Sequence, residues 1–237
     1  MRVLVVVPLT GLRPEVLAQR QGQLAALARP GTEVVFRPVG GPASIESRYE
    51  ESLAAAVAVE ALRVAQIEGG WDAAIVWCAA DPGVAAAREV VDFPVIGPGE
   101  AACTIASLLA SRFITISAVE GDRVLAQELA HRCGFGAKLA GSYAVGIPVL
   151  AMHDDEEDTV QRTVDVVRRT GAGAAALLCL GFTGLGRSIA RQAGVPVVDA
   201  GAAALQMAEL FVAGGYRYSR VSYPVPRKLT GGGAVSG

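Results

Sequence analysis

The sequence predicts an α/β fold of two pseudo-symmetric subdomains, each a mostly parallel sheet flanked by helices. The first observation is that short β-rich runs alternate with longer amphipathic stretches, which is typical of parallel strands with helices on both faces of the sheet. The second is composition. Hydrophobic residues make up 52% of the 237 residues but aromatic residues only 5%, as in proteins whose aliphatic strands are buried on both faces. The third is that part of the pattern occurs twice.

Eight short runs are predicted to be strands and eight longer stretches to be helices. The first run, VLVVV, is followed by Pro8 and lacks a cleavage-site pattern, so it is interpreted as a strand and not as a signal peptide. The predicted strands are residues 3–7, 33–38, 74–77, 95–96, 113–117, 146–149, 175–178 and 197–198. The predicted helices are residues 14–28, 50–68, 83–91, 100–110, 121–133, 155–170, 184–192 and 202–213. Loops that follow the strands are expected to carry the functional site.

The repeated pattern links the two halves of the chain. AAIVWCAADPG at 73–83 corresponds to AAALLCLGFTG at 174–184, with Cys179 lying 101 residues after Cys78. FPVIGPGEAA at 93–102 corresponds to VPVVDAGAAA at 195–204, with Pro196 lying 102 residues after Pro94. A single insertion in a helix would explain the difference of one residue. The alternative is a chance match between alanine-rich α/β segments.

Two similar halves commonly pack about a pseudo-twofold axis, so we expect the active site in the cleft between them. Cys78 and Cys179 would then face each other across a small pocket. To invert a carbon next to a carbonyl, a base removes a proton from one face and an acid delivers one to the other. One thiolate and one thiol suit this task, because the ordinary pKa of cysteine lies near 8.5 and a helix N-terminus lowers it.

Backbone N–H groups after each cysteine are expected to bind the transient enolate oxygen. The residues that supply them are Ala79, Ala80 and Asp81 after the first cysteine, and Leu180, Gly181 and Phe182 after the second.

Composition argues against several other classes of protein. The net charge is −2 and no basic cluster exceeds a pair, which argues against nucleic acid as a ligand. No apolar stretch is long enough for a membrane span. The four cysteines lack CxxC spacing and there are only two histidines, which argues against a zinc site. We expect a cytoplasmic protein with free thiols.

Residue types also indicate the roles of two segments and of one glutamate. The acidic run at 153–158 is expected to begin a helix and not to bind a metal. Glu46 could contact substrate or cap a turn, and the sequence leaves both open. The tail from Leu229 is expected to be disordered.

Several spaced motifs together resemble the aspartate/glutamate/hydantoin racemase superfamily, most closely its hydantoin and allantoin racemase branch. CAADPG at 78–83 is similar to the family's CFGDPG turn, and GPASIES at 41–47 to its GPxSIE segment. CLGF at 179–182 is similar to the second-cysteine turn, usually CAGM. The segments at 86–89, 94–97, 146–150 and 194–204 also fit.

The resemblance implies a cofactor-independent racemase or epimerase that uses Cys78 and Cys179 and binds a small molecule. It implies one subdomain of residues 1–98 plus 206–237 and a second of residues 99–205, and a homo-oligomer is plausible. It also places substrate-binding residues in the N-terminal turn and after the fifth strand. These residues are Pro8, Leu9, Thr10, Ser117 and Ala118.

Departures from the family pattern bear on the substrate. The N-terminal turn, often NPNT, reads VPLT; a Thr-Thr pair is replaced by Ser117 and Ala118; and Phe182 stands where methionine is usual. A less polar pocket favours an apolar substituent, as in a 5-substituted hydantoin, over free aspartate. Two alternatives are a single-cysteine decarboxylase or isomerase, similar to arylmalonate decarboxylase, and a two-lobed binding protein. The missing signal peptide counts against the binding protein.

Overall fold

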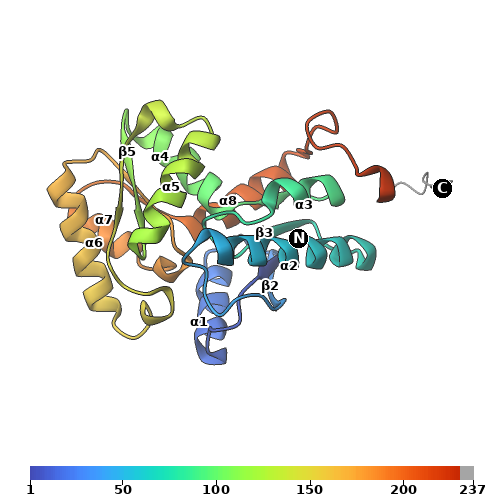
Figure 1. The fold of residues 1–237 in the computed structure, drawn as a ribbon, viewed down its shortest axis with the longest axis horizontal. Helices are drawn as coiled ribbons and strands as arrows, with labels where there is room; N and C mark the ends of the chain where they lie inside the picture. The colour runs from blue at the N-terminus through green and yellow to red at the C-terminus, as the bar shows by residue number, and fades with distance from the viewer. Residues whose placement is uncertain (230–237) are drawn as a thin grey trace.

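The computed structural model describes residues 1–229 and contains two four-stranded parallel sheets (Figure 1). The first sheet has the order β2-β1-β3-β4 and the second the equivalent order β6-β5-β7-β8. The strands are β1 (Arg2–Val7), β2 (Glu33–Pro38), β3 (Ala73–Val76), β4 (Val95–Ile96), β5 (Phe113–Ser117), β6 (Leu139–Ala144), β7 (Ala175–Leu177) and β8 (Val197–Asp199). The predicted α/β class with two similar halves is confirmed. The tail beyond Leu229, for which disorder was predicted, lies outside the described residues.

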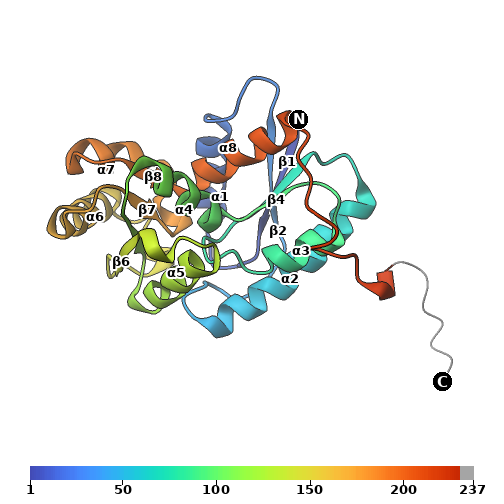
Figure 2. The ribbon, with the colours of Figure 1, turned by 90° about the horizontal axis from the view of Figure 1, so that it is seen from above.

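Helices cover both sheets, and two of them pack on the sheet of the half that they do not follow in the chain. Figures 1 and 2 show α1 (Pro14–Ala25), α2 (Arg48–Glu68) and α3 (Val84–Val90) around the first sheet. The second sheet is covered by α5 (Glu120–Arg132), α6 (Glu156–Thr170) and α7 (Gly186–Ala193). Although α4 (Pro98–Leu109) follows the first sheet, it packs on the second; α8 (Ala200–Ala213) follows the second sheet and packs on β3 and β4. The division of the chain into residues 1–98 plus 206–237 and residues 99–205 stays a prediction, and its second boundary falls inside α8.

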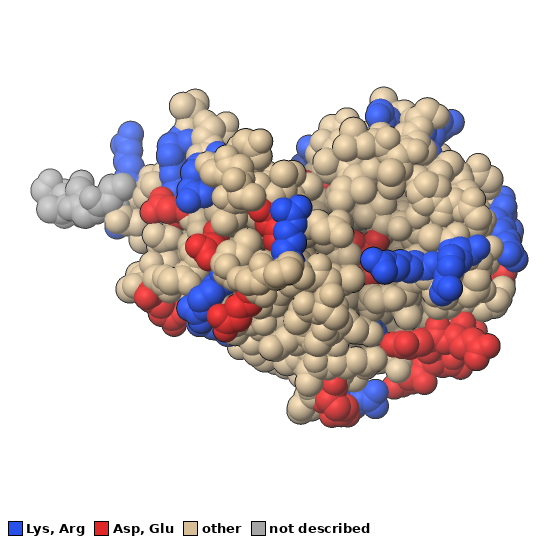
Figure 3. All heavy atoms as spheres, turned by 180° about the vertical axis from the view of Figure 1, so that it is seen from behind, with Lys and Arg blue, Asp and Glu red and all other residues tan. Residues whose placement is uncertain are grey.

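Short 3₁₀ turns complete the described chain. They are η1 (Gly136–Lys138), η2 (Val149–Ala151), η3 (Leu180–Phe182) and η4 (Arg227–Leu229). Within residues 1–229, no helix is both long and apolar enough to span a bilayer. On the face drawn in Figure 3, Lys and Arg side chains lie beside Asp and Glu side chains and do not form one continuous basic surface.

Hydrogen bonds repeat between the halves at the spacing that the sequence predicts. The N–H of Ala74 donates to Pro94 O at 2.8 Å, and the N–H of Ala175 donates to Pro196 O at 3.0 Å. The offset is therefore 101 residues at β3 and β7 but 102 at β4 and β8. Between these strands α7 has eight residues where α3 has seven. The additional residue thus lies in the segment that contains this helix.

One predicted strand is wrong. Residues 146–149 do not form a strand, because Gly146 has a φ of +75° and Pro148 has no N–H to donate. The strand at this point is β6, with the sequence LAGSYA, which pairs with β5 alone at the edge of the second sheet. Its small and polar residues lack the apolar run of a buried strand, so the sequence pattern did not reveal it.

A shared core joins the two sheets. Alternate residues of β1 face opposite ways: Val3 and Val5 join the central cluster, whereas Leu4 and Val6 face α2 and α3. The central cluster also contains residues of β7, α4 and α8. Since this cluster draws on both sheets, the halves form one packed body, and the loops at the ends of their strands are held in fixed relation.

In each half, an aspartate carboxylate ties the cysteine turn to the helix after the next strand. In the first half the carboxylate belongs to the turn: Asp81 accepts from the N–H groups of Gly99 and Glu100 at 2.8 and 2.7 Å. In the second half it belongs to the strand end: Asp199 accepts from Gly184 and Gly201 at 2.7 and 2.9 Å. The bridge is kept, but the residue that carries the carboxylate differs.

This bridge requires a glycine at position 97. A Cβ there would lie 2.4 Å from the Asp81 carboxylate, which cannot move without breaking its two hydrogen bonds. We expect Gly97→Ala to lower the free energy of unfolding by about 2 kcal/mol. The matched control is Gly22→Ala on the exposed side of α1, where a Cβ would have no atom of residues 1–229 within 4 Å. The control should raise stability by about 0.5–1 kcal/mol. Urea denaturation measures both, and equal stability of the two variants would contradict the expectation.

Candidate functional site

A cavity lies between the carboxyl ends of both sheets. It has a volume of about 60 Å³, several times the minimum that one buried water needs. Its walls come from the segments that follow β1, β2, β3, β6 and β7, from the last residue of β5, from α1 and from the first turns of α5. The lining is largely apolar, with Leu12, Ile45 and Trp77 among its residues.

The structure brings many of the predicted site residues together in this cavity and leaves others outside it. Those that line it are Leu9, Cys78, Ala79, Ala80, Ser117, Cys179, Leu180 and Gly181. Those that do not are Pro8, Thr10, Asp81, Ala118 and Phe182. Thr10 is exposed and donates to Pro42 O, Asp81 is committed to its bridge, and Phe182 is buried in the core of the second half.

The two thiols occupy equivalent turns. Cys78 O accepts from the N–H of Asp81 at 3.1 Å, and Cys179 O accepts from the N–H of Phe182 at 3.2 Å. In each turn the backbone N–H two residues after the cysteine, that of Ala80 or Gly181, faces the sulfur. The sequence repeat therefore corresponds to a repeat of the local environment of the thiol.

Burial outweighs these N–H groups in setting the acidity of both thiols. Desolvation raises the pKa of Cys78 far above its ordinary value and raises the pKa of Cys179 to about 12, although the adjacent N–H groups lower both. The sequence led us to expect helix N-termini to lower these values. However, Cys78 precedes α3 by several residues and Cys179 precedes only a 3₁₀ turn, so little helix dipole opposes the desolvation.

The path of the Cys78 turn depends on two residues whose backbone has a left-handed conformation. Asp81 has a φ of +59° and Gly83 a φ of +71°. A Cβ at Gly83 would lie within 2.9 Å of atoms of Val59 and Ala55, so only glycine fits there. The DPG part of the motif thus turns the chain into α3 and anchors it to α4 through the Asp81 carboxylate.

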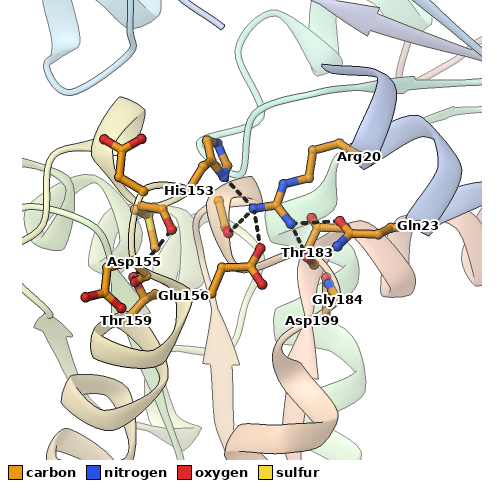
Figure 4. Close-up of polar contacts among 12 residues, drawn as sticks. Arg20, Gln23, His153, Asp155, Glu156, Thr159, Thr183, Gly184 and Asp199 are labelled. Atoms are coloured by element: carbon orange, nitrogen blue, oxygen red, sulfur yellow. Dashed lines mark hydrogen bonds and ion pairs between the residues drawn. The ribbon is translucent and has the colours of Figure 1, made fainter. Parts of the chain in front are cut away.

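A buried arginine from the other half holds the Cys179 turn. Arg20 of α1 is 1% exposed and donates to the carbonyls of Gly181 at 3.1 Å and Thr183 at 2.6 Å. Figure 4 shows its guanidinium between this turn and the segment leading into α6, where it also contacts His153 and Glu156. Burial, and then the charge of Arg20, lowers the pKa of His153 to about 4, so its imidazole is neutral at pH 7.

An acidic side chain completes the cavity wall. Burial raises the pKa of Asp122 to about 7, with Glu46 adding to the effect, and the charge of Asp122 in turn raises the pKa of both Cys78 and Cys179. Glu46 accepts from the N–H of Val149 at 3.0 Å, so it braces the loop before α6. The acidic run begins α6 as predicted, with Asp155 capping its N-terminus.

Sequence reasoning missed Arg20, His153 and Asp122. One signal for Arg20 was present: it lies four residues from both Val16 and Leu24, which are the other buried residues of α1. A charged residue on the buried stripe of a helix needs partners inside the protein. Nothing comparable marked Asp122, which resembles any acidic residue in the first turn of a helix.

Comparisons with known proteins agree with this architecture. Residues 15–208 match the family model described as Asp/Glu/Hydantoin racemase. A hydantoin racemase of Paenarthrobacter aurescens is 34% identical over 233 residues, which cover 95% of this chain and 98% of the relative. The structure of allantoin racemase from Klebsiella pneumoniae is similar with a TM-score of 0.89 at 33% identity, covering 100% of this chain and 96% of that one. Arylmalonate decarboxylase is similar with a TM-score of 0.62 at 17% identity, covering 92% and 96%, which shows the fold alone.

Because the ionised carboxylate of Asp122 opposes thiolate formation, we expect Asp122→Asn to lower the pKa of both cavity thiols. Alkylation of Cys78 and Cys179 by iodoacetamide at pH 8 should then become about threefold faster. The gain should shrink below pH 7, where Asp122 of the parent protein is itself protonated. Mass spectrometry of the modified peptides measures each cysteine separately.

Glu120→Gln serves as the control for this experiment. Glu120 lies in the same first turn of α5, is exposed and pairs with Arg123 instead of facing the cavity. Equal acceleration in both variants would show that the effect comes from net charge and not from the position of Asp122.

Proposed function

The chain belongs to the Asp/Glu/hydantoin racemase family and is a racemase, and we propose that it uses Cys78 and Cys179 as its two acid–base groups. The observation that carries the proposal is that both thiols line one cavity, in turns with the same hydrogen bonds. Two relatives in the comparison are named hydantoin racemase and allantoin racemase, which guides the choice of substrate.

The proposed reaction inverts a carbon that carries a hydrogen next to a carbonyl. One cysteine, as thiolate, removes the proton from one face, and the other, as thiol, delivers a proton to the opposite face. In the reverse direction the two exchange roles, so equivalent environments suit both. The N–H groups of Ala80 and Gly181 stabilise whichever sulfur is ionised. No cofactor is needed, because the chain's own thiols carry both protons.

Desolvation of the thiols also increases the basicity of the thiolate form. A thiolate in a largely apolar cavity is a stronger base than one in water, which helps it to remove a weakly acidic C–H proton. The raised pKa values also imply that the thiolate form is scarce at neutral pH. We therefore expect activity to increase as the pH rises above 8, until stability limits it.

The polar groups of the cavity favour a neutral cyclic amide over an amino acid. Asp122 offers a carboxyl oxygen to an N–H group and disfavours a substrate carboxylate. Both terminal nitrogens of Arg20 are committed to protein acceptors, so a bidentate pair with a carboxylate is blocked. Leu12, Ile45 and Trp77 provide apolar surface for a side chain. We propose a 5-substituted hydantoin as substrate, with contacts from Leu9, Ala79, Ser117 and Leu180, and a homo-oligomeric enzyme.

The two-thiol mechanism makes a specific prediction about single substitutions. Cys78→Ser and Cys179→Ser should each slow racemisation of a 5-substituted hydantoin by roughly a thousandfold, since a serine hydroxyl is a far weaker acid than a thiol. Polarimetry of each pure enantiomer measures the rate. Cys133→Ser is the control, because Cys133 is half-buried at the end of α5 and does not line the cavity. Retention of activity in one of the two site variants would indicate a single-cysteine enzyme instead.

Substrate class is tested separately. Turnover of 5-alkyl or 5-benzyl hydantoin should exceed that of aspartate by at least about a hundredfold, because aspartate would place two carboxylates beside Asp122. Loss of optical rotation and deuterium incorporation at the stereocentre, both in deuterated buffer, give two independent measurements. Faster turnover of aspartate would refute the assignment to cyclic amides while leaving the two-thiol mechanism open.

A further inference from the structure

One N–H group of the Arg20 guanidinium is left without a hydrogen-bond partner within residues 1–229. An arginine carries five N–H donors. Nη1 donates to Gln23 Oε1 at 2.7 Å and to Thr183 O at 2.6 Å, while Nη2 donates to Gly181 O at 3.1 Å and to His153 Nδ1. Figure 4 shows these contacts spreading from the two terminal nitrogens. The fifth donor, Nε–H, is buried and has no hydrogen-bond partner among residues 1–229.

An unpaired buried donor on a charged group is costly, so its position is informative. Arg20 lines the cavity together with Cys179 and Gly181, and it is the one Lys or Arg of residues 1–229 that does so. Its side chain is held on three sides by α1, the Cys179 turn and the segment before α6. The donor that remains thus belongs to a firmly held cation that lines the cavity of the proposed reaction.

The proposed reaction creates a need for such a donor. When a thiolate takes the proton from the carbon, the C–H electron pair forms a carbon–carbon double bond and the carbonyl pair moves onto oxygen. The resulting negative charge lies on one oxygen atom in a cavity whose lining is largely apolar. A fixed cationic donor stabilises this charge more than it stabilises the neutral carbonyl, which lowers the barrier to proton removal.

We propose that the Nε–H of Arg20 binds the substrate oxygen that becomes negatively charged when the neighbouring carbon loses its proton. This inference rests on the proposed function and deepens it. Arg20 remains protonated throughout, and the thiol on the opposite face then returns a proton to the carbon. A single N–H suits one carbonyl oxygen, which agrees with a cyclic amide as substrate. Neutral His153 accepts from Nη2 without adding a second positive charge.

Kinetics of Arg20→Lys test the inference. Lysine keeps the charge but cannot satisfy the carbonyls of Gly181 and Thr183 and also offer a fixed donor to substrate. We expect kcat for deuterium incorporation into a 5-benzyl hydantoin to fall by about a hundredfold, with KM within about threefold of the parent value. Arg13→Lys is the matched control, since Arg13 forms an exposed ion pair with Asp154 just before α1. A kcat for Arg20→Lys within threefold of the parent value would overturn the inference.

A measurement on the parent protein avoids any effect of substitution on folding. The Nε–H resonance of Arg20, assigned by its loss in Arg20→Lys, should move downfield in ¹H–¹⁵N spectra when 5-benzyl hydantoin is added. If the amides of Ala80 and Gly181 respond but this resonance does not, the inference falls and the proposed function stands. If none of the three responds, the cavity does not take this substrate class, and both proposals fall.

Discussion

The parallel pairing of β3 and β7 with the first strands of their sheets is the constraint on which the rest of the structure depends. The N–H of Trp77 donates to Val6 O at 2.7 Å, and that of Leu178 donates to Ile116 O at 2.7 Å. Each bond lies one residue before a cysteine and fixes where the strand ends and the turn begins. Because a shared core under α4 and α8 joins the sheets, fixing the two strand ends also fixes the two thiols relative to each other.

The electrostatics of the cavity follow from the burial of the side chains that line it. Desolvation raises the pKa values of both thiols and of Asp122, and it lowers that of His153, so neutral forms are favoured throughout the site. Arg20 is the exception: although burial lowers its pKa, arginine starts so high that it stays charged. A single stable cation in such surroundings exerts an effect that solvent does not screen. The same burial that makes the thiols weak acids therefore makes the guanidinium an effective partner for developing negative charge.

The two halves share their architecture but differ where they meet the cavity. The carboxylate bridge is carried by the turn residue Asp81 in one half and by the strand-end residue Asp199 in the other. Arg20 supports the Cys179 turn, whereas the Cys78 turn relies on Asp81 and on Gly83. In the mechanism that we propose, two similar thiols act on the two different faces of one substrate, and an asymmetric lining is suited to recognise that molecule.

Much of the fold was determined by the sequence alone, because parallel strands and amphipathic helices leave local periodic patterns. Spaced identities in the sequence showed the duplication and its offsets of 101 and 102 residues. They also showed that Cys78 and Cys179 occupy corresponding positions. The edge strand β6 was not, because a strand with one neighbour and little burial needs no apolar run. Tertiary structure alone decided which cysteine neighbours line the cavity and brought Arg20 to a turn that lies more than 150 residues away in the chain. Burial and long-range hydrogen bonds arise only when distant segments pack, so the acidity of the thiols and the free donor of Arg20 have no local signature.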